Sequence, residues 1–257
     1  NFGNDWSGDI KTKIMLKDKY IFTKKNILIY GLGKTGLSSY QFLKKNNKLY
    51  LFDDKKININ NIEIKKKLIT YNKIKNKQFD HIILSPGINI KKCLLKQYLK
   101  KNLNKIKTDL DVFYSFYGIN KNITITGTNG KSTTAKILFE VMKGQKIDVR
   151  LVGNIGSPIL LEKNINKNTI FVIEASSYQL EYSKLFKSKY AAILNISPDH
   201  LERHLTLNNY INAKFKLIKN QSKEDFAFLN VRNLHIDKKL KKEKLFSKII
   251  RVNKKVN

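Results

Sequence analysis

Two glycine-rich segments each stand between a short apolar run and a helix-compatible run. The first is GLGKTG at residues 31–36, after the run NILIY, and the second is TGTNGKSTT at residues 126–134, after the run NITI. A strand that passes through a glycine-rich turn into a helix brings backbone N–H groups and the positive end of the helix dipole to one point. The chain is therefore expected to contain β-α-β units, two of which are suited to hold a phosphate.

The remaining sequence continues this alternation, which predicts an α/β fold with mainly parallel sheets. In the first part, strands are predicted at 26–30, 48–52, 67–71 and 80–84, helices at 37–46 and 95–105, and short strands are allowed in the isoleucine-rich stretch 58–67. In the second part, strand-turn-helix units are predicted at 122–143, 171–180 and 190–204, followed by a helix at 207–221 and a strand at 225–231. A boundary near residues 117–121 divides the chain into domains 1–118 and 119–257.

The composition bears on partners and location. The net charge of +31 is compatible with a nucleic-acid-binding protein, but lysine is spread over nearly every segment and arginine is scarce, which favours compositional drift. We expect no nucleic-acid partner. The single cysteine, Cys93, indicates a reducing compartment, and no apolar run approaches the roughly 20 residues of a membrane span. We expect a cytoplasmic monomer without membrane insertion.

The first loop by itself suggests a dinucleotide. Gly31, Gly33 and Gly36 have G-x-G-x-x-G spacing, and Asp53 follows about twenty residues later, after a second apolar run. This pattern is compatible with an NAD-dependent oxidoreductase. It is equally compatible with another ligand that carries a diphosphate.

The second loop points to a nucleoside triphosphate. Lys131 is placed to reach the β and γ phosphates and Ser132 to ligate Mg²⁺, although Ile125 stands where a strict Walker A motif has glycine. Glu174 and His200 follow later strands, where ligands bind in open α/β sheets. Lys214 lies in a predicted helix and would be an ordinary surface lysine if it were judged alone.

Taken together, these segments resemble the Mur ligases. The matching pieces come in the family's order between residues 26 and 230: GLGKTG, LSPGI, TGTNGKST, VGNIGSP, EASSYQLE, LNISPDHLERH and YINAKFKLI. The SSYQLE piece is similar to the branch that joins D-glutamate to UDP-N-acetylmuramoyl-L-alanine. The resemblance implies a Rossmann-like first domain that binds the UDP substrate and a P-loop-type central domain that binds ATP and Mg²⁺.

The resemblance also implies roles for individual residues. The ATP phosphate loop would be Gly127, Thr128, Asn129, Gly130, Lys131, Ser132 and Thr133. The catalytic group would comprise Lys131, Glu174, His200 and Lys214, and the metal ligands Ser132, Glu174, His200 and a carbamylated Lys214. The substrate-binding residues would be Gly31, Leu32, Gly33, Lys34, Thr35, Gly36, Asp53, Lys55, Ser85, Pro86, Gly87, Asn154, Ser176 and Gln179.

Two features depart from the family pattern. Asp53-Asp54-Lys55 stands where the family often has Asp-Thr-Arg, so Lys55 lacks the bidentate fork of arginine. The family also has a third domain that binds the incoming amino acid, and we expect this chain to stop inside the central domain and to be inactive alone. The alternatives are a ligase for another amino acid or acceptor and, more distantly, the NAD-dependent oxidoreductase.

Overall fold

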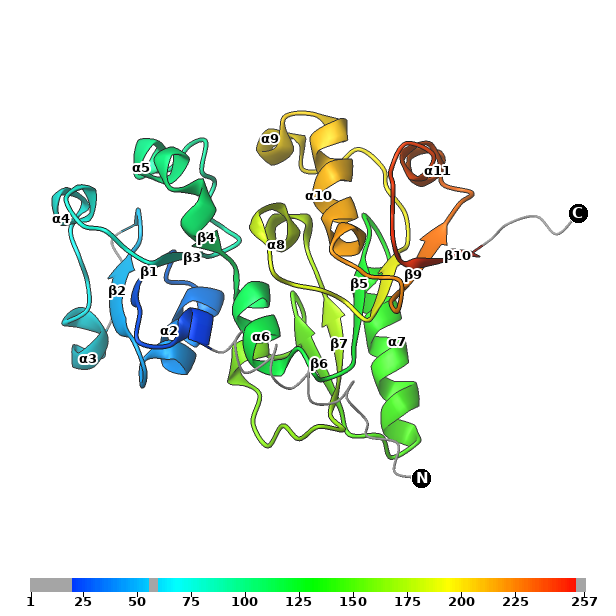
Figure 1. Cartoon of the computed structure of the whole chain (residues 1–257), viewed down its shortest axis with the longest axis horizontal. Coiled ribbons are helices and arrows are strands. Elements are labelled where there is room, and N and C mark those ends of the chain that lie inside the picture. The colour runs from blue at the N-terminus through cyan, green and yellow to red at the C-terminus, as the bar shows by residue number, and fades with distance from the viewer. Residues whose placement is uncertain (1–19, 56–59, 253–257) are drawn as a thin grey trace, which may run out of the picture. The chain divides into compact units, whose positions relative to one another are not determined.

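The computed structural model describes residues 20–55 and 60–252 (Figure 1). The chain divides into two compact units, Asn1–Ile119 and Asn120–Asn257, and each unit has its own sheet. Every strand pairing in both sheets is parallel. No helix within the described ranges has both the length and the apolar character needed to cross a bilayer.

The first unit is a four-stranded sheet in the order β2-β1-β3-β4. Its strands are β1 (Asn26–Tyr30), β2 (Lys48–Phe52), β3 (His81–Leu84) and β4 (Ile106–Lys107). Its helices are η1 (Tyr20–Phe22), α2 (Lys34–Leu43), α3 (Ile62–Lys65), α4 (Tyr71–Lys75), α5 (Lys96–Lys101), η2 (Leu103–Lys105) and α6 (Asp109–Tyr117).

The sheet forms around its central strand, β1, whose residues are apolar and buried. Residues 27–30 of β1 are all buried, which matches the continuous apolar run of a strand covered on both faces. Helix α2 packs on β1 and β3 and contacts α6, where the Phe42 and Phe116 rings meet edge to face at 4.9 Å. Because β1 pairs in parallel with both β2 and β3, the carboxyl ends of these three strands lie next to one another at one edge of the sheet.

The second unit is a six-stranded sheet in the order β10-β9-β8-β5-β7-β6. Its strands are β5 (Asn122–Thr126), β6 (Val149–Gly153), β7 (Ile170–Glu174), β8 (Tyr190–Ile193), β9 (Phe226–Asn230) and β10 (Lys248–Val252). Its helices are α7 (Lys131–Gly144), η3 (Ile159–Leu161), α8 (Ser177–Tyr182), α9 (Leu201–His204), α10 (Leu207–Lys219) and α11 (Leu234–Leu240).

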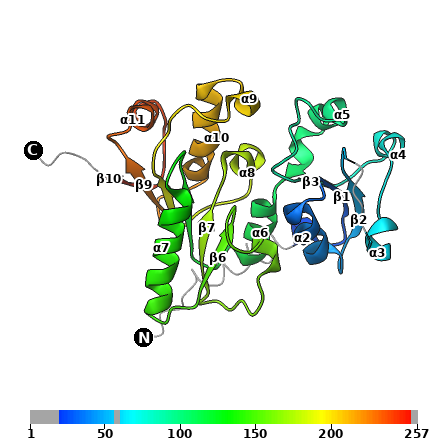
Figure 2. The same ribbon diagram turned by 180° about the vertical axis from the view of Figure 1, so that it is seen from behind.

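The direction of the crossovers puts helices on both faces of this sheet. From β5 the chain crosses to β6 through α7, whereas from β7 it runs the other way, through α8, α10 and α11, to β8, β9 and β10. Right-handed connections then place α7 on one face and α8, α10 and α11 on the other, as Figures 1 and 2 show. Ala135 of α7 packs with Ile125, Val149 and Val172 in a core between this helix and the sheet. The direction in which the chain adds strands to the sheet changes beside β5, so the end of β5 lies at a topological switch point.

Several predicted elements are corrected. The strand predicted at 67–71 is absent: Leu68 makes a single bridge to Leu51, and α4 begins at Tyr71. Short strands in 58–67 were also wrong for the described part, because Asn61 accepts a hydrogen bond from Ile64 N and starts α3; residues 58 and 59 lie outside the described residues. The predicted helix 95–105 is divided into α5 and η2. Strands β4, β6 and β10 were not predicted.

Candidate active site

The second glycine-rich loop connects β5 to α7 and leaves the start of the helix open. Gly130 precedes α7 with φ +80°, in the left-handed region that favours glycine, and no side chain caps the helix. The helices α8, α10 and α11 in the same unit all have such a cap, from Ser176, Thr206 and Asn233. The first amides of α7 have no acceptor within the helix and remain available to an anion.

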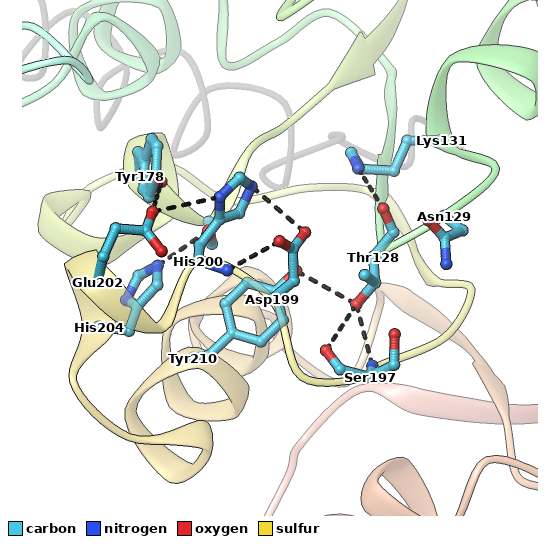
Figure 3. A network of polar contacts seen from close by, with 12 residues as sticks. Thr128, Asn129, Lys131, Tyr178, Ser197, Asp199, His200, Glu202, His204 and Tyr210 are labelled. Carbon is cyan, nitrogen blue, oxygen red and sulfur yellow. Dashed lines mark hydrogen bonds and ion pairs between the residues drawn. The ribbon is translucent and has the colours of Figure 1, made fainter.

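Lys131 is the first residue of α7. Its ammonium donates to the Thr128 carbonyl at 2.8 Å, so the side chain folds back over the loop that precedes it (Figure 3). The lysine charge therefore lies at the same point as the open end of the helix dipole. Two sources of positive potential coincide there.

Glu174, Ser132 and Asn154 meet where β5, β6 and β7 end. The Glu174 side chain is 1 % exposed, and its two carboxylate oxygens accept from Ser132 Oγ at 2.8 Å and from Asn154 Nδ2 at 2.9 Å. Gly153 permits this approach, since a Cβ there would lie 2.4 Å from the Glu174 carbonyl oxygen. The structure thus brings together three residues that the sequence places in different motifs.

Glu174 and Ser132 are oxygen donors that could hold a magnesium ion. Mg²⁺ prefers oxygen ligands and keeps several waters, so a carboxylate and a hydroxyl are a suitable pair of protein ligands. Glu174 and Ser132 supply these two oxygens at the open end of α7. Across residues 20–55 and 60–252, no group of three or more His, Cys, Asp or Glu side chains is arranged to hold a metal by itself.

Lys214 lies on the inner face of α10, not on its surface. The residue is 1 % exposed, and its ammonium donates to the Gly127 carbonyl at 2.7 Å and lies 4.5 Å from the centre of the Tyr210 ring. Burial, and next the neighbouring Lys131 charge, lower the pKa of Lys214 to about 7. At neutral pH this amine is therefore divided between its charged and neutral forms.

His200 is in a second cluster, drawn in Figure 3. Its Nε2 lies 3.4 Å from Asp199 Oδ2 and its Nδ1 lies 3.7 Å from Glu202 Oε1, while its ring contacts those of Tyr178 and Tyr210. Among the contacts of the described residues, none joins His200 directly to Glu174 or Lys214. Tyr210 is the link, since it contacts both His200 and Lys214.

Ser176 and Gln179 together form a capping box at the start of α8. Ser176 Oγ accepts from Gln179 N at 3.3 Å, and Gln179 Oε1 accepts from Ser176 N at 3.2 Å. Both side chains therefore contribute to holding α8 in place. The structure shows a local positioning role for the pair, and contact with a substrate stays a prediction.

In the first unit, the loop Gly31–Gly36 is packed tightly against the end of β3. A Cβ at Gly31 would lie 2.7 Å from Ser85 Cβ, and one at Gly36 would lie 1.8 Å from the Gly31 carbonyl oxygen. Ser85 Oγ donates to that same oxygen at 2.6 Å. Helix α2, which follows the loop, also has a glycine N-cap without a side-chain hydrogen bond.

These contacts predict a large difference between two glycines of the loop. We expect Gly36→Ala to lower the free energy of unfolding of the first unit by about 3 kcal/mol, because the added methyl group overlaps the backbone. Gly33→Ala is the matched control: a Cβ at Gly33 meets nothing within 4 Å, and its φ is −71°. We expect it to change the free energy by less than about 0.5 kcal/mol. Urea unfolding followed by circular dichroism measures both, and equal stability of the two variants would contradict the packing described.

Asp53 holds the first loop from the end of β2. Its carboxylate accepts from Leu32 N at 2.7 Å and from Lys55 N at 2.9 Å. The following residue, Asp54, accepts a short hydrogen bond from the Tyr30 hydroxyl. Burial, followed by this bond to Asp54, raises the pKa of the Tyr30 hydroxyl, which therefore keeps its proton. The loop at 31–36 is thus held by Asp53 and Ser85, which follow β2 and β3, the strands on either side of β1.

Two residues that the sequence analysis did not single out hold the second loop and the His200 cluster. Asn195, just after β8, binds the backbone of Thr128 and Asn129. Tyr210 binds the Thr128 hydroxyl and packs against His200. The sequence offered two signals for these residues: Asn195 comes just after a strand, and Tyr210 comes four residues before Lys214.

Comparison with known proteins identifies the family. The Mur ligase middle domain matches residues 125–256, and the N-terminal domain of MurD-like Mur ligases matches residues 25–107. The chain belongs to the Mur ligase family. The α/β fold and the family resemblance predicted from the sequence are thereby confirmed.

Relatives of this Mur ligase chain include the UDP-N-acetylmuramoylalanine–D-glutamate ligases of two bacteria. The Rickettsia bellii protein is 38 % identical over 218 residues, which cover 83 % of this chain and 47 % of the relative. The Caldicellulosiruptor bescii protein is 39 % identical over 219 residues, which cover 81 % and 48 %. The Mur ligase chain therefore spans about half the length of the curated relatives it matches.

Among solved structures, one similar fold is the UDP-N-acetylmuramate:L-alanyl-gamma-D-glutamyl-meso-diaminopimelate ligase from Neisseria meningitides. It matches with a TM-score of 0.56 at 16 % identity, over 89 % of this Mur ligase chain and 78 % of that chain. At this identity the similarity establishes the fold alone.

Proposed function

We propose that this chain provides the UDP-substrate and ATP sites of a ligase that joins D-glutamate to UDP-N-acetylmuramoyl-L-alanine. The observation that carries the proposal is the convergence at the start of α7, where an uncapped helix end, Lys131, and the Ser132–Glu174 pair share one point. A triphosphate needs this combination of amides, ammonium and metal-binding oxygens. The matched relatives carry the name of this activity.

The proposed reaction has two steps. An oxygen of the L-alanine carboxylate attacks the γ-phosphorus of ATP, and the bond to ADP breaks, which gives an acyl phosphate. The D-glutamate amine then attacks the acyl carbon, loses a proton, and inorganic phosphate leaves as the amide forms. Lys131 and the α7 amides stabilise the negative charge on the phosphoryl group as it is transferred. Magnesium bound by Ser132 and Glu174 would neutralise further charge on the β and γ phosphates.

Lys214 suits a covalent modification that turns a cation into an anion. Its neutral amine would add to CO₂, forming an N–C bond and releasing one proton to give a carbamate. A pKa of about 7 leaves much of the amine neutral at physiological pH, which an ordinary surface lysine does not offer. The carbamate and His200 would then hold a second metal near the acceptor carboxylate.

The first unit would bind the UDP diphosphate at Gly31–Gly36. The uncapped start of α2 and the fixed backbone of the loop supply the amides, and Lys34 and Lys55 supply nearby charge. One copy of the chain carries both phosphate loops, so the proposal requires no second copy. ATP and UDP-linked sugars are cytoplasmic metabolites, so we place the reaction in the cytoplasm.

Calorimetric titration of the 257-residue chain tests the ligand class. We expect UDP-N-acetylmuramoyl-L-alanine and UDP to bind and NADH not to bind, because the loop at 31–36 is proposed to take the diphosphate of a uridine nucleotide. Circular dichroism of the same preparation serves as the control that the chain is folded. Binding of NADH without binding of UDP would favour the oxidoreductase and contradict the proposal.

A further inference from the structure

The phosphate loop is tied to the segment that carries His200. Strand β5 pairs with β8, with Thr126 beside Ile193, so the loop after β5 and the segment after β8 leave the sheet side by side. That segment, 194–200, ends at Asp199 and His200. Two side chains, Asn195 and Thr128, connect the two backbones.

Asn195 uses both ends of its amide on the loop. Its Oδ1 accepts from Thr128 N at 3.1 Å and from Asn129 N at 2.8 Å, and its Nδ2 donates to the Asn129 carbonyl at 3.0 Å. The Asn195 carbonyl also accepts from Thr128 N at 3.0 Å. These bonds fix the first half of the loop and leave the amides at the start of α7 to a ligand.

Thr128 makes the reciprocal connection (Figure 3). Its hydroxyl accepts from Ser197 N at 3.0 Å and lies 3.3 Å from the Ser197 carbonyl oxygen and 3.2 Å from the Tyr210 hydroxyl. The loop is thereby held from the 194–200 segment and from α10.

A loop with glycine at 127 and 130 has many accessible backbone conformations, and fixing it costs conformational entropy. If side chains of the protein fix it beforehand, the ligand does not bear that cost. We infer that Asn195 and Thr128 are positioning residues that lock the phosphate loop in its binding conformation and hold it in register with the His200 segment. That the locked loop serves ATP rests on the proposed function. That Asn195 and Thr128 lock the loop does not.

The first test measures the lock without a ligand. Hydrogen–deuterium exchange followed by NMR in the 257-residue chain should show the Asn129 amide exchanging at least about tenfold faster in Asn195→Ala, since this amide loses its acceptor, Asn195 Oδ1, whereas the Thr128 amide keeps the Asn195 carbonyl. Asn233→Ala is the matched control: its Nδ2 donates to the Ile196 carbonyl in the same segment and its Oδ1 caps α11, without a contact to the loop. We expect no change at Thr128 and Asn129 in this variant. Unchanged exchange in Asn195→Ala would overturn the inference.

The second test asks what the lock does. Calorimetric titration with Mg-ATP should show at least about tenfold weaker binding for Asn195→Ala, which corresponds to about 1.4 kcal/mol, with unchanged binding of UDP. Thr128→Ser keeps the hydroxyl and should bind Mg-ATP like the unmodified chain, whereas Thr128→Val keeps the shape and should bind about tenfold more weakly. A purely steric role would give the opposite order and would overturn the inference. If the unmodified chain binds no Mg-ATP, the proposed function fails, and the exchange result alone decides whether the lock exists.

Discussion

Replacing Lys131 with alanine is expected to lower kcat of the ligase by about 10²- to 10³-fold, the cost of removing one positioned group that stabilises transition-state charge. The free energy of unfolding should change by less than about 1 kcal/mol, because the lysine makes one hydrogen bond to the loop carbonyl of Thr128. The assay is phosphate release in a protein of the relatives' full length that contains these residues.

Lys136→Ala provides the control for this prediction. Lys136 is exposed on the same helix, α7. Its replacement removes an equal charge, but at a position away from the open helix end. We expect its kcat to stay within about twofold of the unmodified protein, since exposed charges in water interact weakly. Equal loss of activity in the two variants would show that overall charge, not the position of Lys131, matters.

Replacing Lys214 with methionine is expected to stabilise the fold while it removes activity. Burial lowers the pKa of Lys214 from 10.5 to about 7, so between these values the unfolded chain binds more protons than the folded chain. The stability of the unmodified protein therefore rises with pH from about 7 towards 10.5, and below pH 7 it carries the full cost of the buried charge. Since one pKa unit corresponds to about 1.4 kcal/mol, the change from 10.5 to about 7 corresponds to about 5 kcal/mol. The Gly127 carbonyl loses its hydrogen bond in the variant, which costs about 1 to 2 kcal/mol. We therefore expect a gain of about 3 kcal/mol for Lys214→Met at pH 6, which shrinks as the pH approaches 9.5.

Urea unfolding at pH 6 and pH 9.5, in buffer free of bicarbonate, measures this gain. Lys219→Met is the control, because Lys219 is exposed on the same helix and forms an ion pair with Glu243. Its effect should stay below about 1 kcal/mol at both pH values. If Lys214→Met gives no gain at pH 6, or a gain that does not shrink at pH 9.5, then Lys214 is not held with a lowered pKa.

The sequence predicted the parts of the site that local patterns determine. A glycine-rich turn between an apolar run and a helix places Lys131 and Ser132 at a helix start whatever surrounds it. Glu174 ends an apolar run, and a parallel sheet brings the ends of such runs to one edge. The contact between Glu174 and Ser132 could therefore be expected from the sequence. The α/β fold class was readable because apolar runs alternate with helix-compatible stretches along the chain.

Other parts depend on contacts between residues far apart in the sequence. Asn195 binds a loop more than 60 residues away, and the segment around it shows only an asparagine after a strand. The burial of Lys214 was partly readable, since Tyr210, Lys214 and Ile218 recur every four residues on the apolar face of α10. At 67–71 the apolar run misled, because Leu68 makes only one bridge at the edge of the sheet and stays partly exposed.

Phosphate release measures whether the ligase pairs D-glutamate with UDP-N-acetylmuramoyl-L-alanine. A protein of the relatives' full length that contains these residues is supplied with Mg-ATP, UDP-N-acetylmuramoyl-L-alanine and one amino acid at a time, with Lys131→Ala as the inactive control. We predict phosphate release that requires the UDP-sugar and is fastest with D-glutamate. Faster release with any other amino acid, or release that does not need the UDP-sugar, would contradict the proposed reaction.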